Sequence, residues 1–185
     1  MATQQYLKLK EGYWYEAKDA DYRARELFDR HYSRRRYKDG RKPLKFVGPG
    51  EYRVLLTAAC DALFVWRKFI SDDGQQGINC AVFRNEGQIL SSTLILEACE
   101  LAWEKWPNQR LYTYVNPRKI RSTNPGYYFL KAGFVKCGVS KRSKLVILER
   151  YPNQYVIPIA AIEAAQGCDF PPQPEGVGSP IAGVG

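Results

Sequence analysis

Residues 82–134, VFRNEGQILSSTLILEACELAWEKWPNQRLYTYVNPRKIRSTNPGYYFLKAGF, contain the most informative pattern of expected strands and helices in the chain. An apolar run, residues 78–83, leads into it and is typical of a buried strand that ends in a polar turn. Ser91 and Ser92 stand where a helix N-cap is expected, apolar residues then recur at helical spacing, and Pro107 stops the helix. The stretch therefore opens with a strand, a turn and a helix.

The remainder of the stretch returns to β-structure. Residues 111–115 predict a second strand, residues 126–131 a short helix, and Phe134 leads into an antiparallel pair at 135–139 and 145–148. Two strands that are joined by a helix run parallel, so their carboxyl ends meet at one edge of the sheet. Ligands of open sheets bind in the crevice outside such ends, and we expect the functional site there.

The N-terminal part predicts a short helix among antiparallel strands. Asp19 or Asp21 can cap this helix. Alternation of apolar and polar residues predicts strands at 6–10, 52–58 and 62–70. We therefore expect an α+β domain over residues 1–150, with a mixed sheet flanked by helices. Residues 151–185 form a C-terminal extension that is rich in proline and glycine from about residue 167, which is typical of a flexible tail.

Composition limits the function without deciding it. The 185 residues are 45% hydrophobic and 14% aromatic, which indicates a globular protein. The formal net charge of +9 suggests an anionic partner, most often nucleic acid, but a soluble basic protein without such a partner fits equally well. The odd number of cysteines, without a CxxC pair, predicts reduced thiols in a cytosolic compartment. No secretory signal or membrane span is expected.

A basic, aromatic segment runs from Arg30 to Lys45. It holds eight lysines and arginines and one acid, and Tyr32, Tyr37 and the following Phe46 are interleaved with the charges. Cations bind phosphates and flat rings stack on unpaired bases, so this pattern favours nucleic-acid contact over a merely solvated loop. The residues that we expect to bind DNA are Arg34, Arg35, Arg36, Lys38, Arg118, Lys119 and Arg121.

His31 is the only histidine of the chain, and it lies at the start of the basic segment. A histidine in this place is a general base, a metal ligand or a plain polar residue at a helix end. The sequence leaves these three roles open.

The order of the expected elements, over about residues 6–150, resembles the GNAT superfamily of N-acetyltransferases. The most specific pieces are Val115-Asn116-Pro117, Asn124, Tyr127-Tyr128 and Lys131-Ala132-Gly133-Phe134. The resemblance implies an Asn near a strand end and a Tyr that acts as a general acid towards a departing thiolate.

A narrower resemblance is to the phage Mom family. It rests on residues 83–86, 91–95, 112–117 and 121–127, with Asp29-Arg30-His31-Tyr32-Ser33 in addition. Mom proteins are GNAT-like enzymes that place a carbamoylmethyl group on the exocyclic amine of adenine in phage DNA and so protect it from restriction. The resemblance implies double-stranded DNA as the partner, the cytoplasm of an infected bacterium as the location, and iron as a candidate cofactor. A homodimer is an open alternative to a monomer.

The resemblance also implies a set of site residues. The catalytic candidates are His31, Tyr32, Ser92, Asn116 and Tyr127. The candidates for binding substrate or cofactor are Arg84, Glu86, Ser91, Asn124 and Tyr128. His31 and Tyr32 are candidate metal ligands, with Asp29 or Glu86 as the nearest carboxylates in the sequence. Each residue also has a plain structural interpretation: the serines as helix caps, Arg84 as an ion-pair partner of Glu86, Tyr127 as core and Asn124 as part of a turn.

Two departures from the family patterns bear on the donor of the group, which the sequence does not identify. Arg84-x-x-Gly87-x-Ile89 keeps only the first half of the GNAT pyrophosphate loop, so acetyl-CoA is expected to bind weakly or not at all. Asn116 stands where the Mom pattern has an acid. Two other functions stay open: an ordinary acetyltransferase acting on a small amine or a protein, and a non-catalytic DNA-binding protein on a GNAT scaffold.

Overall fold

The computed structural model describes residues 7–8, 12–34, 37–41, 43–120 and 123–152. Residues 153–185 of the predicted C-terminal extension lie outside these residues, as do Tyr6, Leu9 and Lys10 of the first predicted strand.

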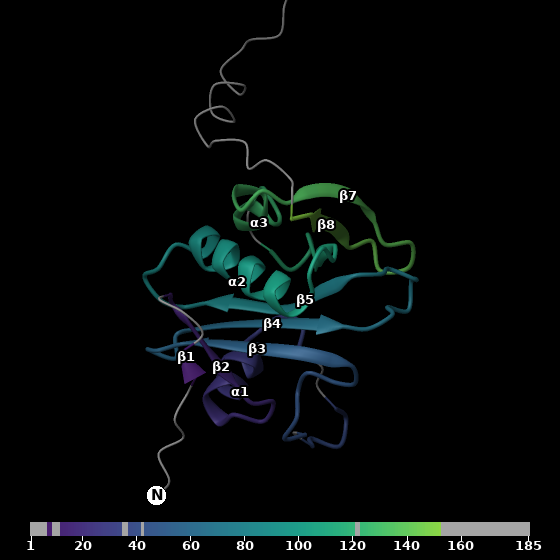
Figure 1. Ribbon diagram of the computed structural model, residues 1–185. Coiled ribbons are helices and arrows are strands. Elements are labelled where there is room, and N and C mark those ends of the chain that lie inside the picture. The colour runs from purple at the N-terminus through teal and green to yellow at the C-terminus, as the bar shows by residue number, and fades with distance from the viewer. Residues whose placement is uncertain (1–6, 9–11, 35–36, 42, 121–122, 153–185) are drawn as a thin grey trace, which may run out of the picture.

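The described chain is α+β, as the sequence predicted, with one mixed sheet and helices on both of its faces (Figure 1). The strands are β1 (Leu7–Lys8), β2 (Trp14–Ala17), β3 (Glu51–Thr57), β4 (Ala62–Lys68), β5 (Ile78–Asn85), β6 (Leu111–Val115), β7 (Val135–Val139) and β8 (Val146–Arg150). The helices are α1 (Tyr22–Asp29), α2 (Ser91–Lys105) and α3 (Tyr127–Lys131). The strand order is β1-β2-β3-β4-β5-β6-β8-β7, and the expected parallel crossover joins β5 to β6 through α2.

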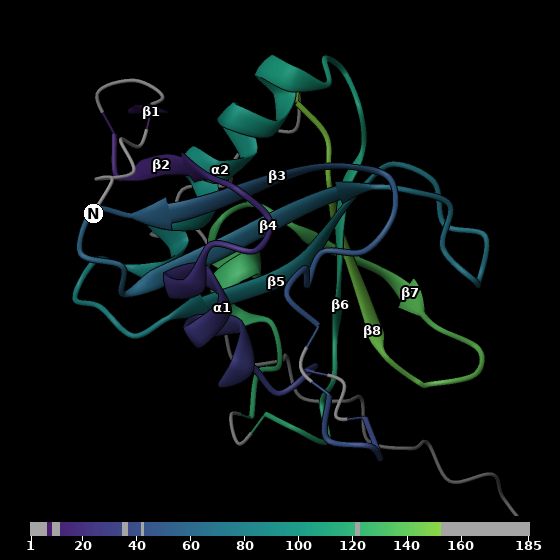
Figure 2. The same ribbon diagram turned by 90° about the horizontal axis from the view of Figure 1, so that it is seen from below.

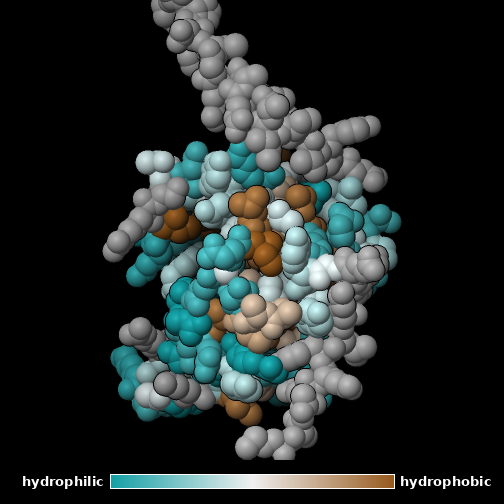
Figure 3. Space-filling model, turned by 90° about the vertical axis from the view of Figure 1, so that its left-hand side faces the viewer, coloured by the Kyte–Doolittle hydropathy of each residue, from teal (hydrophilic) through white to brown (hydrophobic). Residues whose placement is uncertain are grey.

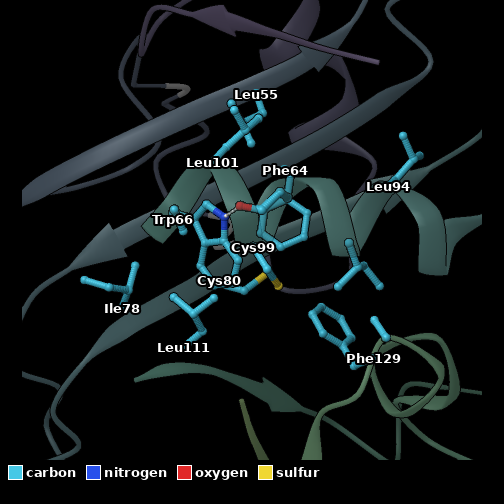
Figure 4. Close-up of a cluster of buried hydrophobic side chains, with 14 of the residues drawn as sticks. Leu55, Phe64, Trp66, Ile78, Cys80, Leu94, Cys99, Leu101, Leu111 and Phe129 are labelled. Atoms are coloured by element: carbon cyan, nitrogen blue, oxygen red, sulfur yellow. Dashed lines mark hydrogen bonds between the residues drawn. The ribbon is translucent and has the colours of Figure 1, made fainter. Parts of the chain in front are cut away.

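Alternation along the central strands divides the core into two clusters. Leu55, Phe64 and Trp66 face α2 and form the α2-side core with apolar residues of α2 and β6, as Figure 4 shows in close-up. Val54 and Val65 face α1 and belong to the α1-side core. Because both faces of β3 and β4 are covered, these strands are nearly continuous apolar runs rather than half-polar ones.

Two tryptophans attach α2 to the sheet. The indole Nε1 of Trp66 donates to the Ala98 carbonyl at 2.8 Å, and that of Trp14 donates to the Leu94 carbonyl at 2.9 Å. Both rings are fully buried, so the bonds satisfy groups that burial would otherwise leave unpaired. Trp14 thus packs under a helix, whereas its neighbour Tyr13 is 46% exposed.

The parallel pair separates soon after it forms. β5 and β6 are paired only from Ile78–Leu111 to Cys80–Thr113, and beyond that point they diverge (Figure 2). On its other side, β5 shifts register against β4 at Ala81, because Val65 pairs with Val82 while Trp66 pairs with Cys80. An extra residue of this kind bends a strand and exchanges the faces of the residues after it. The bulge and the divergence open a gap in the middle of the sheet.

The structure corrects the start of α2. Neither Ser91 nor Ser92 is the N-cap: Leu90 holds that position, without a side-chain hydrogen bond, and the two serines begin the helix. The polar turn before the helix is also shorter than predicted, since Arg84 and Asn85 still belong to β5. Figure 3 shows the side of the molecule on which β5 ends, where hydrophobic residues reach the surface only in separate patches. The cap of α1 is Asp21, one of the two predicted residues.

Candidate functional site

A cavity of about 230 Å³ lies in the gap between β5 and β6. Residues from four parts of the chain line it: the segment after α1, the two diverging strands, the loop after β6, and α3. They are His31, Tyr32, Cys80, Ala81, Val82, Phe83, Thr113, Tyr114, Val115, Ile120, Asn124, Gly126, Tyr127, Tyr128 and Phe129. The predicted residues His31, Tyr32, Asn124, Tyr127 and Tyr128 are therefore brought together, at the strand ends where the sequence placed the site.

A second cavity of about 270 Å³ opens on the α1 face of the sheet. Its walls include Ser33, Asn79, Asn116, Lys119 and Leu145. It shares five lining residues with the first cavity, namely His31, Tyr32, Cys80, Ala81 and Tyr114. The two cavities are therefore adjoining chambers that share these residues. Two ligands could meet there from opposite sides of the sheet.

An ion-pair cluster holds the segment after α1 against the end of β5. Arg30 forms two bonds with the Glu86 carboxylate, at 2.9 and 2.8 Å. Arg84 pairs with the same carboxylate at 2.5 Å and donates to the Arg30 carbonyl at 2.8 Å. The two guanidinium groups lower the pKa of Glu86 to about 2, the hydrogen bond from Arg30 being the largest cause. Arg84 and Glu86 do not line either cavity. The structure shows the ion pair between them that the plain structural interpretation of Arg84 predicts.

His31 is held as a neutral imidazole. Its Nδ1 lies 2.7 Å from the Ser33 hydroxyl and 3.3 Å from the Ser33 amide, which donates to it. A backbone hydrogen bond to Phe83 engages the ring as well. Burial, with a smaller effect of the nearby Arg84 charge, lowers the pKa of His31 from 6.5 to about 4. The imidazole is therefore unprotonated at neutral pH.

The ring of Tyr32 packs against that of His31 in a tilted arrangement, with 4.4 Å between the ring centroids. A backbone hydrogen bond to Asn116 connects Tyr32 to the end of β6. Partial burial raises the pKa of its phenol, so Tyr32 is neutral too. Both residues line the two cavities.

The start of α3 brings two tyrosines to the first cavity. Gly126 precedes them with φ of 85°, and a Cβ there would lie 2.6 Å from Leu148 Cδ1, so only glycine fits this approach to β8. Tyr127 and Tyr128 are 41% and 54% exposed, with ring centroids 5.6 Å apart. Both residues line the first cavity and are partly exposed.

Asn116 shapes the turn after β6. Its side-chain oxygen accepts the Arg118 amide at 3.0 Å, and its carbonyl accepts the Lys119 amide at 3.1 Å. Asn116 lines the second cavity together with Lys119, whose side chain is exposed. Asn124 lines the first cavity, and its carbonyl accepts the Tyr127 amide. The two asparagines thus belong to different chambers.

The serines predicted for the site lie elsewhere. Ser91 accepts a hydrogen bond from Asn85 at 3.1 Å, in the first turn of α2, and neither Ser91 nor Ser92 lines the two cavities. Asn85 also donates to the Ile89 carbonyl and accepts from Gly87, so it organises the whole loop before α2.

The basic residues divide into two groups. Arg34 pairs with Asp29 at 2.5 Å and is mostly buried, so its charge is already neutralised within the chain. Lys38, Arg118 and Lys119 are exposed and can reach an anionic partner. Arg35, Arg36 and Arg121 lie outside the described residues.

Sequence reasoning missed the residues on the strands themselves: Asn79, Cys80, Thr113 and Tyr114. Thr113 donates to the Cys80 carbonyl at 3.3 Å, at the last paired position before the strands diverge. Burial raises the pKa of the Cys80 thiol well above its ordinary value, so it is not a thiolate nucleophile at neutral pH.

The described residues do not fit an iron site. Among them, no three His, Cys, Asp or Glu side chains are grouped closely enough to hold a metal ion. His31 already hydrogen bonds Ser33 and the Phe83 backbone, and the carboxylate of Asp29 is paired with Arg25 and Arg34. His31 and Tyr32 alone are too few ligands for such a centre.

The low pKa of His31 predicts how stability depends on pH. An unfolded chain takes up a proton at His31 near pH 6.5, whereas the folded chain does so only near pH 4. The contribution of His31 to stability is therefore complete above pH 6.5 and is lost as the pH drops from 6.5 to 4. Glutamine cannot be protonated in this range. We therefore expect the melting temperature of His31→Gln to fall less between pH 6.5 and pH 4 than that of the wild type. Equal losses would contradict the buried, neutral state of His31.

Comparisons with protein-family models, with curated proteins and with solved structures found no match to this chain. No helix among the described residues is long and apolar enough to cross a membrane.

Proposed function

We propose that this protein modifies DNA as Mom proteins do, by adding a carbamoylmethyl-type group to the exocyclic amine of adenine. One observation carries the proposal. The gap between β5 and β6 gathers His31, Tyr32, Asn124, Tyr127 and Tyr128, which the resemblance had selected from distant parts of the sequence. Residues chosen for unrelated structural reasons would have no cause to meet in one cavity.

The arrangement of the elements supports the GNAT part of the proposal. The resemblance implied a helix among antiparallel strands, then a strand–turn–helix–strand unit, a short helix and a final pair of strands. α1, β3, β4, the β5–α2–β6 unit, α3 and the β7–β8 pair follow that order. We therefore take the fold as GNAT-like and the domain as catalytic.

The two chambers suit a reaction on a base that has left the duplex. An adenine amine inside a base-paired stack cannot be reached, so the nucleotide must be flipped into a pocket. The second cavity offers Tyr32 and Tyr114 as flat surfaces and exposed Lys119 beside it as a cation for phosphate. The first cavity, with the hydroxyl groups of Tyr127 and Tyr128, is left for the donor of the group.

The loop before α2 argues against acetyl-CoA as that donor. A pyrophosphate loop must offer free backbone N–H groups. Here the Glu86 amide donates to the Asp61 carbonyl at 2.8 Å, and the Gly87 amide donates to the Asn85 side chain at 3.0 Å. The Asp61 carboxylate also lies against Gly87, since a Cβ there would be 2.2 Å from Asp61 Oδ2. Because these amides already donate hydrogen bonds and the Asp61 carboxylate is adjacent, binding of a diphosphate to this loop is disfavoured.

We therefore expect isothermal calorimetry with acetyl-CoA to give no saturable heat. A dissociation constant in the micromolar range would contradict this expectation and favour the ordinary acetyltransferase. Coenzyme A, which carries the same diphosphate without the acetyl group, is the matched ligand: binding of both would show that the loop opens for diphosphate.

Binding to DNA should depend on the exposed cations after β6. We expect the double substitution of Arg118 and Lys119 by alanine to weaken binding to duplexes of any sequence. The slope of log K against log salt should also become shallower, by about 1 for each phosphate that the protein no longer neutralises. Fluorescence anisotropy over a salt series measures both quantities. Lys68→Ala is the control, because Lys68 pairs with Ile78 at the opposite end of β5. An unchanged slope in the double variant would show that Arg118 and Lys119 do not neutralise DNA phosphates.

The test of the proposed function is nucleoside analysis of DNA from bacteria that express the protein. We expect mass spectrometry to find an adenine nucleoside that carries a carbamoylmethyl group, and the DNA to resist restriction enzymes whose sites contain adenine. DNA that is bound by the purified protein but contains only ordinary nucleosides would favour the non-catalytic alternative.

A further inference from the structure

Asn79 has a feature that the fold does not explain. Its side chain is buried, with 5% of the residue exposed, and it lines the second cavity. Within the described part of the chain, its amide nitrogen Nδ2 has no hydrogen-bond partner. A buried N–H donor without an acceptor is costly, and native proteins keep few of them. A donor of this kind on the wall of a cavity points to a ligand that carries the acceptor.

The position of Asn79 on the sheet is well defined. It precedes the bulge at Ala81 and pairs with Arg67 of β4 and Tyr112 of β6. Its neighbour Cys80 belongs to the α2-side core, so Asn79 faces the α1 side, where the second cavity opens. Because the strand is paired on both sides there, the amide is held on a rigid element, as recognition of a ligand edge requires.

The other walls of this cavity suit a nucleobase. Tyr32 and Tyr114 offer aromatic faces, and the exposed Lys119 offers a cation. An asparagine amide pairs with the edge of adenine that carries N6 and N7, donating from Nδ2 to N7 and accepting from the N6 amine. Guanine presents a second acceptor, O6, where adenine presents the amine, and so cannot satisfy the side-chain oxygen.

We propose that Asn79 determines the specificity for adenine by donating from Nδ2 to N7 and accepting, through Oδ1, from the N6 amine of a base flipped into the second cavity. The inference rests on the proposed function, because it takes the ligand of that cavity to be the base that is modified. It goes beyond that function by assigning the selection of the base to a strand residue outside the motifs shared with known families.

The test compares two DNA probes on the intact protein. Both are short duplexes with one unpaired base opposite an abasic site; the base is adenine in one and 7-deazaadenine, which lacks the N7 acceptor, in the other. By fluorescence anisotropy, we expect the wild type to bind the adenine probe about tenfold more tightly. Asn79→Leu, which has a similar shape without the donor, should bind both probes equally and melt no lower than the wild type, since it removes an unpaired buried group.

The outcomes separate the inference from the function on which it rests. Equal binding of the two probes by the wild type would overturn the role of Asn79 but would not contradict the proposed DNA modification. This comparison uses the wild type alone, so it does not depend on whether the variant folds. Discrimination that persists in Asn79→Leu would assign the recognition of N7 to another residue and overturn the inference as well. If the wild type binds neither probe nor an ordinary duplex, the proposed function itself falls.

Discussion

Replacing His31 by alanine should reduce modification of adenine at least 100-fold, about the lower bound for the loss of a positioned acid or base. The amine must lose a proton when it takes up the group, and His31 supplies the only imidazole of the chain. Its ring lines both chambers and stays unprotonated down to a pH of about 4. Mass spectrometry of nucleosides from plasmid DNA co-expressed with each variant measures the loss.

A second variant separates proton transfer from positioning. The side chain of His31 also orders its surroundings, through Ser33, the Phe83 backbone and the ring contact with Tyr32. Glutamine can replace several of these hydrogen bonds but cannot accept a proton from an amine. We expect His31→Gln to bind DNA and fold like the wild type, by gel shift and circular dichroism, yet to be as inactive as His31→Ala. Recovery of modification in His31→Gln would show that the imidazole positions its neighbours and is not the base.

The fold could be predicted largely from local patterns. The alternation of residues 52–58, the helical spacing after Ser92 and the stop at Pro107 each depend on neighbouring residues, and the structure places β3 and α2 there. The parallel pairing of β5 and β6 followed from the length of their connection. The cap of α2 was mispredicted because the helix begins at Ser91, so Leu90 takes the cap position, and the Ser91 hydroxyl accepts from Asn85.

The candidate site could be predicted only in part. His31 and Tyr127 were found because they lie in loops and at helix ends, where a motif marks a position directly. Asn79, Cys80 and Tyr114 were not, since their access to the gap depends on where β5 and β6 stop pairing, and the faces of Val82 and Phe83 depend in addition on the bulge at Ala81. A single extra residue in a strand exchanges its faces, and nothing in the run of residues 78–83 marks where that residue is inserted.

Removing one hydroxyl group from α3 should be almost as damaging as removing the imidazole. We expect Tyr127→Phe to lower modification about 100-fold, because the GNAT resemblance assigns this phenol the protonation of the departing group. The ring would remain, with its contact to the neighbouring tyrosine and the Lys131 ammonium 5.5 Å from its centroid, so packing is preserved.

Tyr128→Phe is the matched control for this prediction. The two tyrosines are adjacent on the same helix, both line the first cavity, and both are partly exposed, so the substitutions remove the same atom from nearly the same environment. A general loss of polarity in the cavity would lower activity alike in both variants, whereas a proton donor must be one particular hydroxyl group. We expect Tyr128→Phe to stay within a few-fold of the wild type in the nucleoside assay, with unchanged melting temperature in both variants. If instead Tyr128→Phe is the inactive variant, the acid is Tyr128. If both variants retain activity, the departing group takes its proton from neither tyrosine, and the role that the resemblance gives to α3 is wrong.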